Sequence, residues 1–492
     1  MKFSRFKSSP FGEVDPAGDV SLARRQMGFV IGGAVIRFSC FLLGSIVLTK
    51  LIAPDDFARL IYIGVPLSLA NLFGDFGLGD GAIRLKRVDS RIASLFLWIS
   101  LSAAFVSALF FLASIPLFEL WFHGTELMDL GLAFAAVVLV QGFQGQYRAL
   151  LRRQMRLKLL STSDVVTSVI ANGVGVTLAF FGFGVIAIPL GRLAAVVCEL
   201  IIFVAATGWI PGRMAKLSEM SGTLGFGFKL AASGFFHFGM RSISAFVLGR
   251  MFPEDVLGYL ERATTLTQGV AERLTHVVSR VMFPLLSRSQ HGPRSRFEDL
   301  ATSIHRILAR LTILPTLLLV PFVPHAVLAI FGEEWVPMGF YLGWMVFGVA
   351  MAIPSFVAVM ALLSAGGSGR LLKLNAGTFG LRMLVVAITV LWYRDLWLYV
   401  VVVSISEPLV CVVSTVVSAR FVRIRARVML RNVLVPFLIG VGAILVLQRL
   451  IPLIGVSSSI GLALVLGGAA VIIPFWYSGD MRVMAGLKSS QV

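Results

Sequence analysis

The chain has 492 residues, of which 57% are hydrophobic and 14% are charged, and its mean hydropathy is +0.90. This composition excludes an ordinary soluble globular domain and predicts a protein that crosses a membrane many times. A formal charge of +18 would favour nucleic acid as a partner in a soluble protein, but here most basic residues lie between apolar runs. Because basic loops are retained in the cytoplasm, we attribute the charge to topology and expect no nucleic-acid partner.

The chain begins with a polar segment that has mixed charge and no apolar signal-peptide core. We expect residues 1–26 to form a cytoplasmic tail. Beyond it, windows of about 20 apolar residues, the length that crosses a bilayer, predict about fourteen transmembrane helices. The predicted helices are 27–48, 59–82, 93–117, 127–147, 161–182, 186–207, 222–248, 256–286, 304–331, 339–364, 372–392, 396–419, 433–451 and 459–478.

An internal repeat suggests how these helices are grouped. Residues 47–57 (VLTKLIAPDDF) resemble residues 247–256 (VLGRMFPEDV), and both copies end an apolar helix on the same predicted side of the membrane. This pattern predicts parallel repeats, although helix-ending turns of this kind also arise by chance. The fold class is therefore an all-α integral membrane protein with two pseudo-symmetric six-helix lobes and a C-terminal helix pair. The predicted segments are an N-lobe (27–207), a cytoplasmic linker (208–221), a C-lobe (222–419), a basic cytoplasmic loop (420–432), the helix pair (433–478) and a cytoplasmic tail (479–492).

Basic residues concentrate in the segments that this topology places in the cytoplasm. One cluster, between the fourth and fifth predicted helices, contains Arg148, Arg152, Arg153, Arg156 and Lys158. The positive-inside rule then places both termini in the cytoplasm.

Six short motifs resemble landmarks of a known family. They occur in the order in which that family has them: residues 49–57 (TKLIAPDDF), 74–82 (GDFGLGDGA), 146–158 (QYRALLRRQMRLK), 257–263 (LGYLERA), 283–288 (FPLLSR) and 331–335 (FGEEW). The chain thus resembles Wzx-type polysaccharide flippases of the multidrug/oligosaccharidyl-lipid/polysaccharide exporter superfamily. It departs from the pattern at Ser244, where many members have Asp, and at Leu260, where they have a second Tyr. Any ion-coupling or substrate role that depends on that Asp in other members is therefore not expected in this chain.

The resemblance implies a transport function. Such proteins move undecaprenyl-diphosphate-linked oligosaccharide units across the bacterial inner membrane for the synthesis of exopolysaccharide, capsule or O-antigen. It also implies proximity to a polysaccharide polymerase and to glycosyltransferases. The residues show no catalytic constellation and no phosphate-binding G-x-x-x-x-G-K-[ST] loop, so we expect neither an enzyme nor a nucleotide or other cofactor.

Basic residues inside the predicted helices indicate where an anionic substrate would bind. A charge in hydrocarbon costs about 2.5–3.5 kcal/mol, so such residues predict a hydrated cationic cavity. Arg37 and Arg241, deep in the first and seventh helices, are the strongest candidates.

Arg262, Arg273 and Arg280 recur at spacings that return to one helix face and are also predicted to bind substrate. The alternative for these three is a structural ion-pair network, with Glu261 or Glu272 among the partners. The remaining basic residues of the predicted helices are expected either to extend to the membrane interface (snorkel) or to form ion pairs: Arg192, Lys229, Arg306, Arg310 and Arg382.

Carboxylates and histidines in the predicted helices are candidates for ion coupling. We consider Asp75, His237, Glu272 and His276 for this role, since His titrates near neutral pH and buried carboxylates bind cations. Asp164, Glu199 and Glu407 are further intramembrane carboxylates, and the sequence does not choose among them. No metal site or disulfide framework is expected from the three widely separated cysteines. Kinks are expected at Pro315, Pro321, Pro324 and Pro354.

Three other functions remain open from the sequence. A lipid II flippase has a similar helix number and a cationic cavity. A cation-coupled multidrug exporter would favour an acidic or aromatic cavity, against which the arginines argue. A membrane-embedded glycan polymerase or ligase would need a large external loop, whereas the predicted external loops are short.

Overall fold

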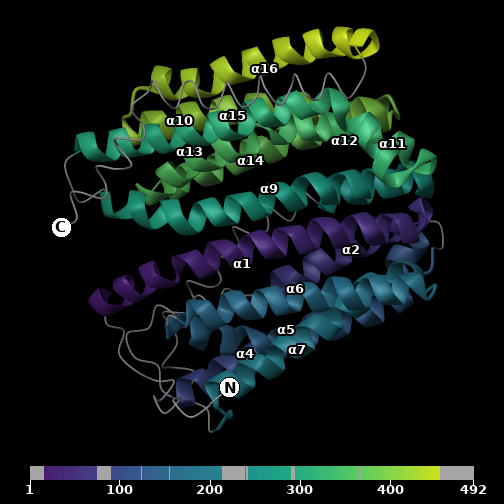
Figure 1. Ribbon diagram of the computed structural model, residues 1–492. Coiled ribbons are helices and arrows are strands. Elements are labelled where there is room, and N and C mark those ends of the chain that lie inside the picture. Colours follow the sequence, from purple (N-terminus) through teal and green to yellow (C-terminus); the bar gives the residue numbers. More distant parts are fainter. Residues whose placement is uncertain are drawn as a thin grey trace. The chain divides into compact units, whose positions relative to one another are not determined.

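The computed structural model describes residues 16–74, 90–122, 125–154, 156–212, 239, 242–289, 294–365 and 367–454 (Figure 1). All regular elements in these residues are helices. The chain divides into two compact units, Met1–Gly258 and Tyr259–Val492.

Unit 1 contains six long helices among its described residues. Most are rich in apolar residues, some of which are buried between the helices while others are exposed on their outer faces. They are α1 (Pro16–Leu51), α2 (Pro54–Gly74), α4 (Ser90–Trp121), α5 (Met128–Arg153), α6 (Leu157–Phe180) and α7 (Ala187–Thr207), with a 3-10 turn, η1 (Gly184–Ile186), before α7. A shorter apolar helix covers Ser242–Met251.

Close approach of helices within unit 1 depends on small residues. A Cβ at Gly33 or Gly44 of α1 would overlap the side chains of Ser161 or Asn172 on α6. These two glycines therefore allow α1 and α6 to run side by side, as Figure 1 shows. Gly191 of α7 plays the same part against α6, because a Cβ there would lie 2.8 Å from the backbone nitrogen of Gly175.

Unit 2 begins within the first turns of α9 (Glu254–Ser289). Its remaining helices include two pairs that are interrupted at prolines. The elements are α10 (Arg294–Leu319), η3 (Val320–Phe322), α11 (Val323–Phe331), η4 (Glu333–Trp335), α12 (Val336–Val349), α13 (Ala352–Ser364), α14 (Ser368–Val386), the π-helix η5 (Ala387–Trp392), α15 (Leu396–Val422) and α16 (Ala426–Ile454).

The core of unit 2 lies among α10, α13, α15 and α16. One buried cluster joins Ile304, Ala358, Ala419 and Met429 from these four helices. A second joins Ile313 to Met351, Cys411 and Val433, where the chain turns between α12 and α13. The helices of this unit are thus held by apolar packing at two levels along their length.

The predicted all-helical membrane architecture is confirmed for the described residues. Ten stretches of these residues are long and apolar enough to cross a membrane by length and composition. Apart from 59–82, 222–248 and 459–478, which extend outside the described residues, every predicted span falls on helical structure. The count of fourteen helices, the two six-helix lobes and the segment boundaries stay predictions.

Proline breaks two of the predicted spans. The span 304–331 is interrupted by η3, which contains Pro321 and is followed by Pro324. The span 339–364 is interrupted at residues 350–351, three residues before Pro354. Because proline lacks an N–H and clashes with the preceding turn, these breaks have a local cause, whereas Pro315 lies within α10.

Candidate functional site

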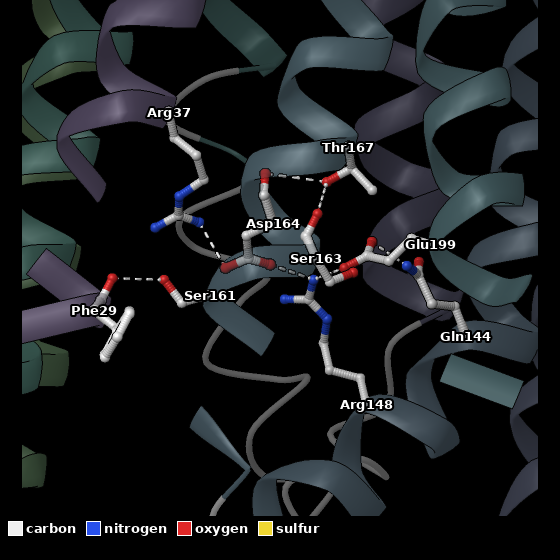
Figure 2. A network of polar contacts seen from close by, with 9 residues as sticks. All are labelled: Phe29, Arg37, Gln144, Arg148, Ser161, Ser163, Asp164, Thr167 and Glu199. Carbon is white, nitrogen blue, oxygen red and sulfur yellow. Dashed lines mark hydrogen bonds and ion pairs between the residues drawn. The ribbon is translucent and has the colours of Figure 1, made fainter. Parts of the chain in front are cut away.

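Five polar side chains from four helices of unit 1 form a charge network (Figure 2). Arg37 comes from α1, Gln144 and Arg148 from α5, Asp164 from α6 and Glu199 from α7. Arg37 lies about 21 Å along α1 from its end at Leu51, so its side chain starts deep within the helix. We call these five residues the charge network.

Asp164 is the centre of the charge network. Its Oδ2 accepts a hydrogen bond from Nη1 of Arg37 at 2.7 Å, and its Oδ1 accepts one from Nη2 of Arg148 at 2.7 Å. Figure 2 shows one guanidinium on each side of this carboxylate. The two oxygens of one carboxylate therefore bridge two arginines that are far apart in the sequence.

Glu199 is the second carboxylate of the charge network. It forms an ion pair with Arg148 and accepts a hydrogen bond from Nε2 of Gln144. Gln144 and Arg148 are four residues apart on α5, so both face α7 from one side of that helix. Arg148 also places its guanidinium carbon 5.6 Å from the ring centroid of Phe203, one turn beyond Glu199 on α7.

Burial within the charge network is uneven. The side chains of Arg37 and Arg148 are 28% and 30% exposed, whereas those of Asp164 and Glu199 are 10% and 7% exposed. The two arginine side chains are therefore partly exposed, whereas the two carboxylates that neutralise them are nearly buried. The buried Nε of Arg37 has no hydrogen-bond partner among the described residues. Such an arrangement suits an anion with several oxygens, because the planar forks of two arginines present many donors.

The surrounding side chains fix the α6 part of the charge network. Thr167 donates its hydroxyl to the carbonyl oxygens of Ser163 and Asp164 at 3.0 and 3.1 Å. Ser161 donates to the carbonyl oxygen of Phe29 on α1 at 3.1 Å, one turn before Asp164. The Thr167 bonds lie within α6, and the Ser161–Phe29 bond connects α6 to α1 beside the Arg37–Asp164 pair.

Unit 2 has an ion pair of its own. Arg382 of α14 pairs with Glu407 of α15, and the two side chains are 20% and 30% exposed. Gly348 of α12 makes room for this carboxylate, since a Cβ there would lie 3.3 Å from Cγ of Glu407. The sequence predicts that Arg382 either snorkels or forms an ion pair, and the structure confirms the ion pair.

The predicted substrate residues of α9 lie in one helix, as expected from their spacing. Arg262 is buried, with 3% of its surface exposed, while Arg273 is half-buried and donates to the carbonyl oxygen of Gly269 at 2.8 Å. Glu272 is exposed. The backbones of His276 and Arg280 belong to α9, but their side chains are outside what the structure describes.

Arg241, Asp75 and His237 lie outside the described residues. Among the predicted substrate residues that the structure describes, it places Arg37 in the charge network. The role of Arg37 in binding, and the roles of the other predicted residues, stay predictions. Within the described part of the chain, no group of three or more His, Cys, Asp or Glu side chains is arranged to hold a metal ion.

Sequence reasoning missed Arg148 and Gln144. The charge pattern groups Arg148 with the cytoplasmic cluster before Lys158, but this residue lies within α5, about 8 Å from the helix end at Arg153. Its spacing of four from Gln144 is the signal that could have found it, since it puts two polar side chains on one face of an apolar helix. The carboxylates Asp164 and Glu199 are recognisable as intramembrane residues, but their partners are not.

Known proteins resemble this chain in sequence and in fold. The family model described as "Polysaccharide biosynthesis protein" matches residues 47–339. The lipopolysaccharide biosynthesis protein WzxC of Escherichia coli (strain K12) is 24% identical over 61% of this chain and 61% of its own length. The teichuronic acid biosynthesis protein TuaB of Bacillus subtilis (strain 168) is 21% identical over 54% of this chain and 55% of its own length. The chain therefore spans about three fifths of the length of the curated relatives it matches.

A solved structure extends the likeness to nearly the whole chain. The lipid II flippase MurJ in an inward closed conformation matches with a TM-score of 0.68 and 13% identity, over 92% of this chain and 100% of that one. At this identity the match shows a shared fold.

Proposed function

Because the chain belongs to the polysaccharide biosynthesis protein family, whose model matches residues 47–339, we propose that it flips an undecaprenyl-diphosphate-linked oligosaccharide across the bacterial inner membrane. The observation that carries this proposal is the uneven burial of the charge network. Arg37 and Arg148 are partly exposed, whereas Asp164 and Glu199, which pair with them, are nearly buried. The diphosphate is the part of such a lipid that hydrocarbon excludes most strongly, and arginine forks replace its hydration.

The depth of the charge network fits this function. Asp164 is about 10 Å along α6 from Leu157, and Arg37 is farther from either end of α1. Fixed charges at such positions in membrane-spanning helices are costly and mark substrate pathways. In the proposed topology, with both termini in the cytoplasm, the network is reached from the cytoplasmic half of the membrane, where the lipid-linked unit is made.

The proposal includes the arrangement expected from the sequence. Two six-helix lobes and a terminal helix pair would alternate access to a central pathway, and Arg241, Arg262, Arg273 and Arg280 would contribute further cationic groups. Asp75, His237, Glu272 and His276 remain candidates for ion coupling. The oligosaccharide would pass to a polysaccharide polymerase after transport, and the protein itself would carry out no covalent chemistry.

Complementation tests this function. The full chain is expressed in a host that lacks its own polysaccharide flippase, and surface polymer and accumulated lipid-linked oligosaccharide are both measured. We expect wild type to restore polymer, Arg37→Gln to lose it, and Arg37→Lys to keep part of it. Arg59→Gln, which alters an exposed pair with Asp129 on other parts of α2 and α5, is the control.

Rescue by Arg37→Gln at equal membrane abundance would remove this residue from the pathway. Failure of wild type in that host and in hosts with other repeat units would contradict the proposed substrate class. Rescue of a host that lacks its lipid II flippase would instead assign the substrate to that related lipid.

A further inference from the structure

Asp164 makes the contacts that an anionic ligand of the charge network would make. Each of its oxygens accepts a hydrogen bond from a different guanidinium at 2.7 Å. Phosphate oxygens bind arginine in the same way, with N–H donors aligned on two oxygens. A diphosphate that enters between Arg37 and Arg148 therefore competes with Asp164 for the Nη donors that this carboxylate uses.

The charges of the network lead to the same conclusion. Two guanidinium groups balance two carboxylates, Asp164 and Glu199, so the described network is neutral. A diphosphate diester carries two negative charges. Adding it beside both paired carboxylates would leave an excess of negative charge among spanning helices, which is strongly unfavourable, so binding requires Asp164 to move away from the guanidinium groups that the diphosphate contacts.

One donor of Arg37, its buried Nε, has no hydrogen-bond partner among the described residues. The same guanidinium donates from Nη1 to Asp164. A guanidinium can donate five N–H groups, so this arginine is only partly satisfied by its carboxylate. Arg37 can therefore give up its hydrogen bond to Asp164 for a ligand that offers several phosphate oxygens as acceptors.

We propose that Asp164 is an internal competitor for the substrate head group, and that the diphosphate takes Arg37 from it and so loosens the contact between α1 and α6. This inference rests on the proposed function. In the unliganded state the carboxylate keeps both arginines paired, which avoids isolated positive charges in the membrane. On binding, the tie between Arg37 of α1 and Asp164 of α6 is replaced by ties to the ligand.

The location of the pair gives this exchange a structural effect. Arg37 is one turn from Gly33, the glycine that lets α1 approach Ser161 of α6. Ser161 also donates to the carbonyl oxygen of Phe29. The Arg37–Asp164 pair adds a charged contact to this interface, so its loss weakens the attachment of α1 to α6 at that level.

Binding of undecaprenyl diphosphate to the purified full chain tests the competition. The protein is placed in nanodiscs of phosphatidylethanolamine and phosphatidylglycerol, and dissociation constants are measured for wild type, Asp164→Asn, Arg37→Gln and Asp129→Asn. We expect Asp164→Asn to bind about tenfold more tightly, which corresponds to about 1.4 kcal/mol. Asp129→Asn is the matched control, because Asp129 also pairs with an arginine but lies about 28 Å from Arg148 along α5.

The outcomes separate the inference from the proposed function. Tighter binding by Asp164→Asn alone supports the competition. Unchanged or weaker binding by Asp164→Asn, together with weaker binding by Arg37→Gln, overturns the competition and leaves the proposed function intact. Unchanged binding by Arg37→Gln overturns both.

A cross-linking measurement does not depend on the folding of Asp164→Asn. An ideal Cβ at Gly33 lies 3.5 Å from Cβ of Ser161, within the range for a disulfide once the side chain at position 161 rotates away from its present Oγ position, which is 2.2 Å from that Cβ. Cysteines at these two positions, in a chain without its three native cysteines, should form a disulfide more slowly when undecaprenyl diphosphate is present. An unchanged rate with ligand bound would overturn the loosening of α1 from α6.

Discussion

At the scale of single residues, the charge network is a set of mutually dependent charges. Asp164 and Glu199 are nearly buried, and Arg148 is the partner that they share. Removing one member of a buried pair costs more than removing both, because the remaining charge is left without compensation. The network should therefore show strong coupling between substitutions.

Arg148→Gln should destabilise the protein by about 3–5 kcal/mol, since it leaves two carboxylates without that partner. Arg148→Gln combined with Glu199→Gln should recover part of this loss, because one of the uncompensated charges is also removed. Thermal unfolding in detergent of the two single variants and the double variant measures the coupling. Additive losses would show that Arg148 and Glu199 do not interact energetically. Arg59→Gln, in an exposed pair, should change stability by about 1 kcal/mol or less.

At the scale of elements, the packing of α6 on α7 depends on backbone contact. A Cβ at Gly191 of α7 would meet backbone atoms of Ala171 and Gly175, which have little freedom to move. Gly173 of α6 faces open space, because a Cβ added there would have no atom within 4 Å. The close contact between the helices therefore requires a glycine at position 191, whereas packing does not require one at position 173.

Gly191→Ala should destabilise the protein by about 1–3 kcal/mol, as expected when an extra methyl forces two helices apart. Gly173→Ala should be neutral or stabilising by about 0.5–1 kcal/mol, because alanine favours the helix. The two unfolding temperatures, measured in the same detergent, test this difference. Equal effects of the two substitutions would show that α6 and α7 do not approach as closely at Gly191.

The segment after α7 is a second element whose contacts are specific. Gly208 ends the helix with a positive φ of 58°, and Trp209 then donates from Nε1 to Oγ of Ser90 at 3.1 Å. The Trp209 ring also lies 5.2 Å from that of Tyr147. The first residues of the predicted linker 208–221 are therefore attached to α4 and α5.

Trp209→Phe should keep the aromatic contact and lose the hydrogen bond, at a cost of about 1 kcal/mol. Trp209→Ala should cost about 3–5 kcal/mol, since it also removes a buried ring. Limited proteolysis within 208–221, together with the unfolding temperature, reports both effects. If Trp209→Ala is no more susceptible to cleavage than wild type, these contacts do not hold the segment.

At the scale of the whole molecule, hydropathy is sufficient to predict most of the helices. Long apolar windows identify spanning segments because the bilayer imposes a minimum length. The charge pattern is less reliable near helix ends. It assigns Arg148 to a cytoplasmic cluster because this residue precedes Arg152, although the helix continues to Arg153. A rule based on loop charge cannot distinguish a basic residue in the last turns of a helix from one just beyond it.

The sequence does not predict which residues of the charge network pair with one another. Arg37 and Asp164 are on two helices whose close approach Gly33 and Gly44 permit. Many carboxylates are available to Arg37, and hydropathy carries no information on which helices are neighbours. The identities of the intramembrane charges are predictable, while their pairing requires the packing of α1, α5, α6 and α7.

We propose that the partly exposed arginines of the charge network bind a lipid diphosphate as it crosses the membrane. The most direct measurement is transbilayer movement of a fluorescent undecaprenyl-diphosphate-linked oligosaccharide in proteoliposomes that contain the purified protein. We predict movement with wild type and Arg59→Gln, and a loss of about tenfold or more with Arg148→Lys, which keeps the charge but loses the planar fork. Movement at the wild-type rate with both Arg148→Lys and Arg37→Gln would contradict the claim.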